Sequence, residues 1–495
     1  MRFDLVRRPA LVTCALFLGT GCFHLTAGDK TREEFKPPRR LDPAAIAVPE
    51  GYRIEPIATG LTYPTSVTFD DQGTPYVIEA GYSYGEDFTE PRLLRINPDG
   101  SHTVVATGAH PPWTGVVFHQ GAFYVAEGGT QGGGRIVRIT PDGTLTPLVS
   151  GLPSLGDHHT NGPAIGPDGA LYFSVGTATN SGVVGPDSAN AESINWMSRA
   201  AEFHDIPCRD VILRGLNFSS PDPRTPDPDD QATTGAFVPF GTETKPDQVI
   251  RGRVPCSGAV FRLAPGSSAP ELLAWGFRNP YGLAFSPEGQ LYVTENGHDE
   301  RGSRPIFGAG DYLWAVEPGR WYGFPDFAGG RPVNQEWFKP SGKDQPPQFL
   351  LAEHPAPPPR PVAFFGVHSS SNGVDFSRGG AFGHRGLAFV AQFGDQAPDT
   401  GKVMSPVGYK VVRVDVTNGV IQDFAANKDK GSGGPASHLG TGGLERPIAV
   451  RFDPDNGALY VVDFGVMTVI GKDITPYKAT GVLWRITPTG KKEGP

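Results

Sequence analysis

The sequence is poor in several features that would place it in a familiar class. It has only 4 cysteines among 495 residues, and long runs rich in alanine, leucine, glutamate and lysine are scarce. The scarcity of such runs argues against a helical protein. The net charge is −9 and no basic cluster occurs outside the N-terminus, which argues against nucleic acid as a partner.

Short motifs of common enzyme classes are also missing. No CxxCH motif is present, so the chain has no attachment site for a c-type haem. The histidines show no HxH or HExxH spacing, which weakens the case for a zinc site. No GxSxG motif, P-loop or dinucleotide-binding fingerprint occurs between a strand and a helix. These absences argue against the α/β-hydrolases, the P-loop NTPases and the nicotinamide dehydrogenases.

The first 22 residues have the pattern of a signal peptide. Arg2, Arg7 and Arg8 precede a short apolar segment, residues 10–18, which is shorter than the roughly 20 residues that span a bilayer. The segment ends in LGTGC, so two outcomes stay open, lipidation of Cys22 or simple cleavage and secretion. In both cases we expect an exported protein, periplasmic or associated with the cell envelope, with residues 23–48 as a polar tether.

Two cysteines remain in the body of the chain, Cys208 and Cys256. Disulfides persist in oxidising compartments, so we expect an exported protein to join these two. The chain-entropy model gives a loop of this length roughly 4 kcal/mol of stabilisation as an upper value. Two buried free thiols are the alternative.

Glycine and proline, in contrast, are abundant, with 66 and 50 residues, and phenylalanine numbers 30. Such a composition favours many short strands joined by turns. One hairpin pattern, in which a turn separates two apolar strands, begins six times, at residues 64, 114, 162, 281, 372 and 447. Several copies are followed by a further strand of the type GRIVRITPDG. A unit of about four strands repeated every 45 residues or so is the signature of a β-propeller blade.

The sequence therefore predicts an all-β fold, a six-bladed β-propeller over residues 49–490 with long loop insertions. A β-sandwich would explain the strands but not their repetition. Gaps between the later copies of the hairpin hold the insertions, and the largest is expected over residues 181–254.

Residues just before the first strand of a blade tend to face the central channel, where several blades meet in one pocket. Polar or ionisable residues stand at three such positions: Asp157, His158, His159, Arg278, Asn279 and Arg446. Guanidinium groups bind carboxylates through two hydrogen bonds, so this set predicts a site for an anionic ligand beside a proton acceptor. The alternative is that the arginines only tie neighbouring loops together and that the histidine pair has a structural role or is exposed by chance.

Three stretches resemble a known family: DHHTNGPAIGPDGALYFSVG, WGFRNPYGLAFSPEGQLYVTENG and DYLWAVEPGRWYGFP. They resemble the soluble pyrroloquinoline-quinone (PQQ) dehydrogenases, a six-bladed group that includes aldose (glucose) and sorbosone dehydrogenases. The resemblance spans roughly residues 49–488 and is closest to the sorbosone branch, in which PCRD, VPCSGAV and TTGAFVPFGT also look familiar. It implies a PQQ- and Ca²⁺-dependent dehydrogenase that oxidises a sugar or sugar-derived aldehyde and passes electrons to an external acceptor.

The resemblance also implies roles for single residues. His158 matches the general base, which removes a proton from the substrate while hydride passes to the quinone, and the ordinary pKa of imidazole suits that role. Arg278 matches the arginine beside the quinone oxygen, where a cation stabilises the charge that develops on reduction. Asn279 and Arg446 match positions that contact the cofactor, Arg446 through the cofactor's carboxylates.

A calcium site follows from the same resemblance. Gly297 and His298 match a pair whose backbone carbonyls bind the ion. Asp311 matches an acid that holds a calcium-bound water, and Tyr322 keeps the family's spacing to it. Calcium prefers oxygen ligands of this kind and acts on the quinone as a Lewis acid.

The chain departs from the glucose-oxidising branch in three respects, one of which is that the substrate-contacting positions after Gly176 differ, so glucose is not assumed as the substrate. Thr177 follows Gly176 where that branch has an aspartate that orients the histidine, so either Thr177 or an acid from elsewhere holds the imidazole, or the histidine is a weaker base. The lysine that contacts the cofactor in blade five has no clear counterpart in AQFGDQ. Two other classes stay open, a calcium-dependent lactonase with Glu79, Glu127 and Glu295 as candidate ligands, and a non-catalytic binding propeller at the cell surface.

Overall fold

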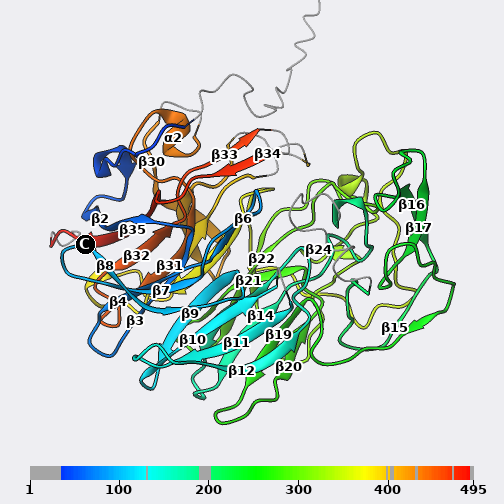
Figure 1. Ribbon diagram of the computed structural model, residues 1–495, viewed down its shortest axis with the longest axis horizontal. Helices are drawn as coiled ribbons and strands as arrows, with labels where there is room; N and C mark the ends of the chain where they lie inside the picture. Colours follow the sequence, from blue (N-terminus) through cyan, green and yellow to red (C-terminus); the bar gives the residue numbers. More distant parts are fainter. Residues whose placement is uncertain are drawn as a thin grey trace, which may run out of the picture.

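Six antiparallel sheets, each of at least four strands, make up most of the molecule (Figure 1). The computed structural model describes residues 35–129, 132–188, 202–396, 400–401, 406–429, 433–470 and 473–490. The predicted signal peptide, residues 1–22, and its Cys22 lie outside the described residues. The predicted all-β fold, a six-bladed β-propeller, is confirmed.

The blades follow one another along the chain, and in each the innermost strand is the first strand of a predicted hairpin. Blades one to three consist of β3 (Pro64–Phe69), β4 (Pro75–Glu79), β7 (Arg92–Ile96) and β8 (His102–Thr107); β9 (Trp113–His119), β10 (Ala122–Gly128), β11 (Gly134–Ile139) and β12 (Leu145–Leu152); and β13 (Thr160–Ile165), β14 (Leu171–Val175), β19 (Ala259–Leu263) and β20 (Glu271–Trp275). Blades four to six consist of β21 (Asn279–Phe285), β22 (Leu291–Asn296), β23 (Tyr312–Ala315) and β26 (Ala363–Phe364); β27 (Ser371–Phe376), β28 (Ala388–Gln392), β29 (Lys410–Asp415) and β30 (Val420–Asn427); and β31 (Pro447–Phe452), β32 (Leu459–Asp463), β35 (Gly481–Pro488) and β2 (Tyr52–Leu61).

The ring of blades is closed by the two ends of the chain. The innermost strands contact one another in the cyclic order β3, β9, β13, β21, β27, β31 and back to β3. In blade six, β2 from the N-terminal part of the chain pairs antiparallel with β35 from the C-terminal part. One sheet therefore contains both ends of the propeller.

The hairpins recur because their turns and their apolar faces repeat. In the third hairpin, Asp168 Oδ1 accepts a hydrogen bond from Ala170 N across 3.2 Å, and Gly169 has a φ of 72°. A glycine adopts that backbone conformation without the steric cost that a Cβ would add. Apolar side chains then pack between neighbouring blades, as Leu94 of blade one does with Val462 of blade six. Burial of each such side chain contributes about 1.5–3 kcal/mol.

The propeller begins earlier than the predicted tether allows. β1 (Ile46–Ala47) adds a fifth strand to blade five by pairing with β30. Arg39 donates a hydrogen bond to Asp463 Oδ2 across 2.6 Å, and both side chains are buried. The predicted boundary at residue 48 is therefore wrong, because residue 39 already packs on the propeller.

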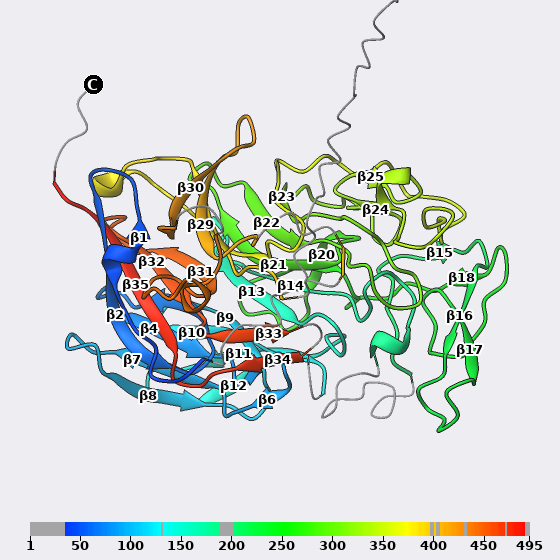
Figure 2. The ribbon, with the colours of Figure 1, turned by 90° about the horizontal axis from the view of Figure 1, so that it is seen from above.

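The predicted insertion leaves blade three between β14 and β19. It contains η2 (Pro186–Ser188) and two hairpins, β15 (Val211–Ile212) with β18 (Val249–Ile250) and β16 (Asn217–Pro221) with β17 (Gln231–Gly235). These green strands lie at the right-hand end of the molecule in both Figure 1 and Figure 2, beyond the blades. The remaining short elements are β5 (Tyr82–Ser83), β6 (Asp87–Phe88), β24 (Phe327–Ala328), β25 (Arg331–Pro332), β33 (Met467–Ile470), β34 (Asp473–Pro476), η1 (Pro43–Ala45), η3 (Glu336–Phe338), η4 (Gly380–Phe382) and α2 (Ala436–Leu439).

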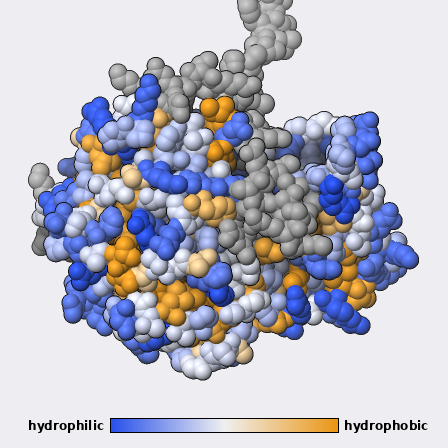
Figure 3. Space-filling model, viewed as in Figure 1, coloured by the Kyte–Doolittle hydropathy of each residue, from blue (hydrophilic) through white to orange (hydrophobic). Residues whose placement is uncertain are grey.

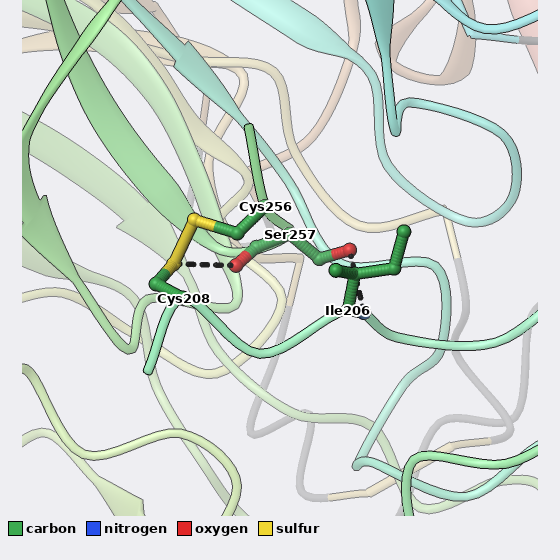
Figure 4. Close-up of a disulfide and its surroundings, with 4 residues drawn as sticks. All are labelled: Ile206, Cys208, Cys256 and Ser257. Atoms are coloured by element: carbon green, nitrogen blue, oxygen red, sulfur yellow. Dashed lines mark hydrogen bonds between the residues drawn. A yellow bond between two sulfur atoms is a disulfide. The ribbon is translucent and has the colours of Figure 1, made fainter. Parts of the chain in front are cut away.

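The predicted disulfide between Cys208 and Cys256 is present (Figure 4). Cys208 belongs to the insertion, and Cys256 lies just before β19 of blade three. Beside the disulfide, Ile206 N donates to Ser257 Oγ across 3.1 Å, and Ser257 N donates to Ile206 O across 2.9 Å. The insertion is thus tied covalently and by hydrogen bonds to the blade that it leaves.

The face of the molecule in Figure 3 mixes hydrophilic and hydrophobic residues in small groups. Large apolar side chains that are exposed lie on separate elements, such as Val104 on β8, Trp337 on η3 and Phe364 on β26. Among the described residues, no helix has the length and apolar character to cross a membrane.

Candidate active site

A cavity of about 250 Å³ lies where loops of several blades meet. Six of the residues singled out from the sequence line it: Asp157, His158, Arg278, Asn279, Gly297 and Asp311. They come from the loop before β13, the start of β21 and the segment between β22 and β23. The structure thus brings these residues to one place, and the space admits a small organic ligand. The position before an inner strand predicted this for Asp157, His158, Arg278 and Asn279, and the family resemblance implied it for Gly297 and Asp311.

His158 is buried at the wall of this cavity and is held by Thr177. Its Nδ1 lies 2.9 Å from the carbonyl oxygen of Thr177 and 3.0 Å from the Thr177 hydroxyl. That hydroxyl donates its own proton to Thr179 O across 2.7 Å, so both oxygens act as acceptors toward Nδ1. The network therefore assigns the ring proton to Nδ1 and leaves the lone pair on Nε2.

The surroundings of His158 keep its imidazole neutral. Burial, aided by the charge of Arg278, lowers the pKa of His158 to about 3, although the carboxylate of Asp157 acts in the opposite direction. Asp157 Oδ2 lies 4.0 Å from His158 Nε2. A neutral imidazole with a lone pair on Nε2 can accept a proton from a ligand in the cavity.

Arg278 presents a rigidly held cation to the same cavity. Its side chain is buried, Nε donates to Asn180 O across 3.0 Å, and one terminal nitrogen donates to Asn180 Oδ1 and to Asp299 Oδ2, both across 2.9 Å. The other terminal nitrogen donates to Asn296 O across 3.3 Å. A fixed guanidinium can stabilise negative charge on a ligand without first reorganising.

Gly297 and Asp311 form an oxygen-rich corner of the cavity. Asp311 Oδ1 accepts from Gly297 N across 3.1 Å, and Oδ2 accepts from Ser369 Oγ and Ser371 N, each across 2.8 Å. A Cβ at residue 297 would lie 2.1 Å from Gly310 O, so the close packing requires glycine there. No group of three or more metal-binding side chains occurs among the described residues, so a cation at this corner would depend on backbone and water oxygens beside the carboxylate.

The analysis of the sequence missed a charge network on the cavity wall, centred on Arg301. Its guanidinium donates to Asp157 Oδ2, to Asp187 Oδ2 across 2.9 Å and to Asp299 Oδ2 across 3.1 Å. Burial is the largest influence and acts to raise the pKa of Asp157, but the charge and hydrogen bond of Arg301, together with the charges of His158 and Arg278, lower it overall. The signal available in the sequence was the charged run ENGHDERGSR after a predicted strand.

His368 was missed as well, and it lines the cavity from the loop before β27. Its Nδ1 lies 3.1 Å from Asp395 Oδ1 and its Nε2 lies 3.7 Å from Asp299 Oδ1. Burial acts to lower the pKa of His368, but the hydrogen bond to Asp395 and the charge of Asp299 raise it overall. Its place just before the fifth hairpin follows the rule that found His158, so the sequence did contain the signal.

The other histidine of the pair, His159, lies outside this cavity. It lines a neighbouring cavity of about 80 Å³, where its ring meets that of Tyr82 edge to face. Burial lowers the pKa of His159 to about 4. The two cavities share Tyr84 and Asn279 in their walls.

Arg446 is not in the cavity, so the structure does not support its predicted contact with a cofactor. Its guanidinium is buried over the rings of Phe393 and Tyr409 and donates to the carbonyl oxygens of Gly394 and Asp395 across 3.4 and 3.2 Å. One terminal nitrogen of Arg446 is thus directed to the backbone that follows β28, which agrees with the structural alternative. The predicted contact of Arg446 with a cofactor stays a prediction.

Tyr322 does not line the cavity, and its predicted part in a metal site stays a prediction. Its hydroxyl donates to Ala315 O and accepts from Glu317 N, each across 2.8 Å, which ties it to the turn after β23. The side chain of His298 stacks on Phe324 outside the cavity. The predicted role of His298 concerns its backbone carbonyl and stays a prediction.

The three glutamates proposed for a lactonase do not converge. Each accepts hydrogen bonds from its own surroundings, Glu79 from Thr62 N, Glu127 from Trp113 Nε1 and Glu295 from Trp314 Nε1. None of the three lines the cavity. Their recurrence at the ends of the second strands is therefore a structural feature of the blades.

Part of the sequence matches a known family. Residues 252–355 match the family described as "Glucose / Sorbosone dehydrogenase", and this segment contains Arg278, Gly297 and Asp311. No curated protein sequence matches the chain.

Solved structures share the fold. The holo form of the pyranose dehydrogenase PQQ domain from Coprinopsis cinerea is 17% identical, covers 91% of this chain and 98% of its own, and superposes with a TM-score of 0.52. The calcium structure of a Trichoderma reesei enzyme of carbohydrate-active family AA12 is also 17% identical, with 91% and 98% covered and a TM-score of 0.50. The resemblance to the glucose and sorbosone dehydrogenases is therefore confirmed, by the family match over residues 252–355 of a six-bladed propeller.

Proposed function

We propose that the protein is an exported dehydrogenase that uses PQQ and Ca²⁺ to oxidise a sugar or a sugar-derived aldehyde of the sorbosone type, with electrons passing to an external acceptor. One observation carries this proposal: a neutral imidazole, His158, and a fixed guanidinium, Arg278, line one cavity. The family match over residues 252–355 and the names of the two solved structures support it.

The residues present fit both groups. PQQ is an acidic quinone, and Arg278 offers it a buried cation whose position is fixed by Asn180 and Asp299. The corner formed by Gly297 and Asp311 offers oxygen donors, which calcium prefers over nitrogen or sulfur.

The chain's own residues supply the proton acceptor and the electrostatic setting of the reaction. His158 Nε2 accepts the proton of the substrate hydroxyl, or of the hydrated aldehyde, because Thr177 holds the ring proton on Nδ1. Arg278 stabilises negative charge that develops beside it. When bound, PQQ accepts the hydride and Ca²⁺ acts as a Lewis acid.

Export is part of the proposal. The disulfide between Cys208 and Cys256 supports it, because structural disulfides persist in oxidising compartments. Attachment to a membrane through a lipid on Cys22 remains the second possible outcome of the signal sequence.

The test is dye reduction by the purified apoprotein after addition of PQQ and Ca²⁺, screened over aldoses, sorbosone and simple aldehydes. We expect activity that requires both additions and a loss of kcat of about 10²–10⁴-fold in His158→Ala, the range typical of a general base. His102→Ala, on the outer strand β8, is the matched control and should keep full activity.

Wild-type turnover in His158→Ala would contradict the assigned base. Failure to bind PQQ would contradict the whole proposal, and hydrolysis of lactones without the quinone would identify a hydrolase in its place.

A further inference from the structure

We propose that Asp205, a carboxylate carried by the insertion of blade three, is a positioning residue for His158 and acts through Thr179 and Thr177. The inference rests on the proposed function, because it concerns the base of that reaction. Asp205 would thus fix the orientation of the His158 imidazole, although the residue in direct contact with that ring is Thr177.

The segment that holds His158 lies outside the strands of blade three. Thr177 contributes both its carbonyl oxygen and its hydroxyl to Nδ1 of His158, and its hydroxyl in turn donates to Thr179 O. Residues 177–179 lie in a loop after β14, outside any strand. The direction of the imidazole therefore depends on the conformation of this loop.

Asp205 satisfies the donors of that loop. Its Oδ1 accepts from Ala178 N across 2.6 Å and from Thr179 N across 3.4 Å, and its Oδ2 accepts from the Thr179 hydroxyl. The Thr179 hydroxyl already accepts from Gly182 N across 2.8 Å, so its proton needs an acceptor on the other side. A carboxylate supplies one, whereas the NH₂ group of an asparagine would not.

The carboxylate of Asp205 is buried and interacts with this loop through hydrogen bonds. Asp205 is 1% exposed, and no lysine or arginine in the described part of the chain forms an ion pair with it. Burial raises the pKa of Asp205 to about 7, and the hydrogen bonds from Thr179 and Ala178 act to lower it. Burial of a carboxyl group without a cation is costly, so its place here is explained by the hydrogen bonds that it accepts.

The segment that carries Asp205 is anchored on both sides. Figure 4 shows the disulfide between Cys208 and Cys256 and the hydrogen bond from Ile206 N to Ser257 Oγ. On the other side, Phe203 packs with Ala178 in one apolar cluster. The blade-three insertion is thus fixed against the loop that holds His158, and Asp205 lies between the two anchors.

The test reads the tautomer of His158 in the apoprotein at pH 8, by ¹⁵N NMR of histidine-labelled protein, with the signal assigned by its loss in His158→Gln. We expect a single Nδ1–H tautomer in the wild type and a mixture of tautomers in Asp205→Asn and in Thr179→Val. Thr179→Ser keeps the hydroxyl and should restore the wild-type signal. Asp210→Asn, an exposed carboxylate of the same insertion paired with Arg251, is the matched control.

In the reconstituted enzyme, Asp205→Asn and Thr179→Val should lower kcat by about 10- to 100-fold, with KM changed by less than about threefold, because misplacement of a catalytic group acts on the chemical step. An unchanged tautomer and kcat in either variant, with folding verified by circular dichroism, would overturn the inference. If the tautomer shifts in the variants while the wild type oxidises nothing, the positioning role holds and the proposed dehydrogenase function fails.

Discussion

At the residue scale, one guanidinium near His158, that of Arg301, forms ion pairs with three carboxylates. Arg301 bonds to Asp157, Asp187 and Asp299, and the four side chains are between 14% and 26% exposed. Without Arg301, Asp157 and Asp187 would lose their ion-pair partner in a poorly hydrated cavity wall, whereas Asp299 would keep Arg278. Arg301 therefore affects both the stability of the fold and the charge near the imidazole.

Replacing Arg301 by methionine keeps the length of the side chain and removes the charge. We expect Arg301→Met to lower the free energy of unfolding by about 3 kcal/mol, because removal of one partner of a largely buried ion-pair network leaves Asp157 and Asp187 without their cation. Urea denaturation measures the change. Arg262→Met is the control, since Arg262 also bridges two acids, Asp168 and Glu271, but at the surface. An equally large loss in Arg262→Met would contradict the argument.

The sequence predicted His158, Arg278, Gly297 and Asp311 because motif and position before an inner strand point to them. It did not predict the network around Arg301, because Asp157 and Asp187 lie on segments whose distance from Arg301 only the closed ring determines. The third partner, Asp299, lies two residues from Arg301 in the sequence. The spacing of Tyr322 to Asp311 was kept, yet the hydroxyl is used by the turn after β23. Spacing along the chain indicates which residues lie close together, whereas the available hydrogen-bond partners decide where a side chain points.

At the element scale, the hairpins were predictable because each carries its own turn signal and alternating apolar residues. β1 was not, because a strand of two residues, Ile46–Ala47, has no such pattern and exists only by pairing with β30. The length of the blade-three insertion was predicted, but its contact with the loop that holds His158 was not. Its contact with the loop after β14 depends on tertiary packing, which no local pattern encodes.

The disulfide should matter for the stability of this insertion. Exchange of both cysteines for serine, Cys208→Ser with Cys256→Ser, is expected to lower the free energy of unfolding by about 2–5 kcal/mol, since the crosslink restricts the unfolded chain. Thermal unfolding with and without a reductant measures the effect. The reductant should lower the melting temperature of the wild type and leave that of the double variant unchanged. A wild type that does not respond to complete reduction would contradict the prediction.

At the scale of the whole molecule, the closed ring determines where polar groups are buried. Loops from different blades meet around one axis. Carboxyl groups and imidazoles that lie far apart in the sequence are therefore buried from solvent in the same region of the fold. Burial raises the pKa of four carboxyl groups to about 7: Glu127, Asp205, Glu295 and Glu445. Burial lowers the pKa of His158 to about 3 and of His159 to about 4.

These shifts predict how stability depends on pH. A carboxyl group whose pKa is higher in the folded than in the unfolded protein contributes stability at low pH, and that contribution is lost as the pH rises through about 7. The two histidines act in the reverse direction, since stability is lost as the pH falls below about 6.5 and the unfolded chain takes up protons. The four carboxyl groups outnumber them, so we expect a higher melting temperature at pH 5.5 than at pH 8. Glu445→Gln should reduce this difference, because it removes one buried titrating group, whereas Glu243→Gln, at an exposed position, should not. A melting temperature that rises from pH 5.5 to pH 8 would mean that the histidines dominate and that the carboxyl groups are ionised in the folded protein at lower pH.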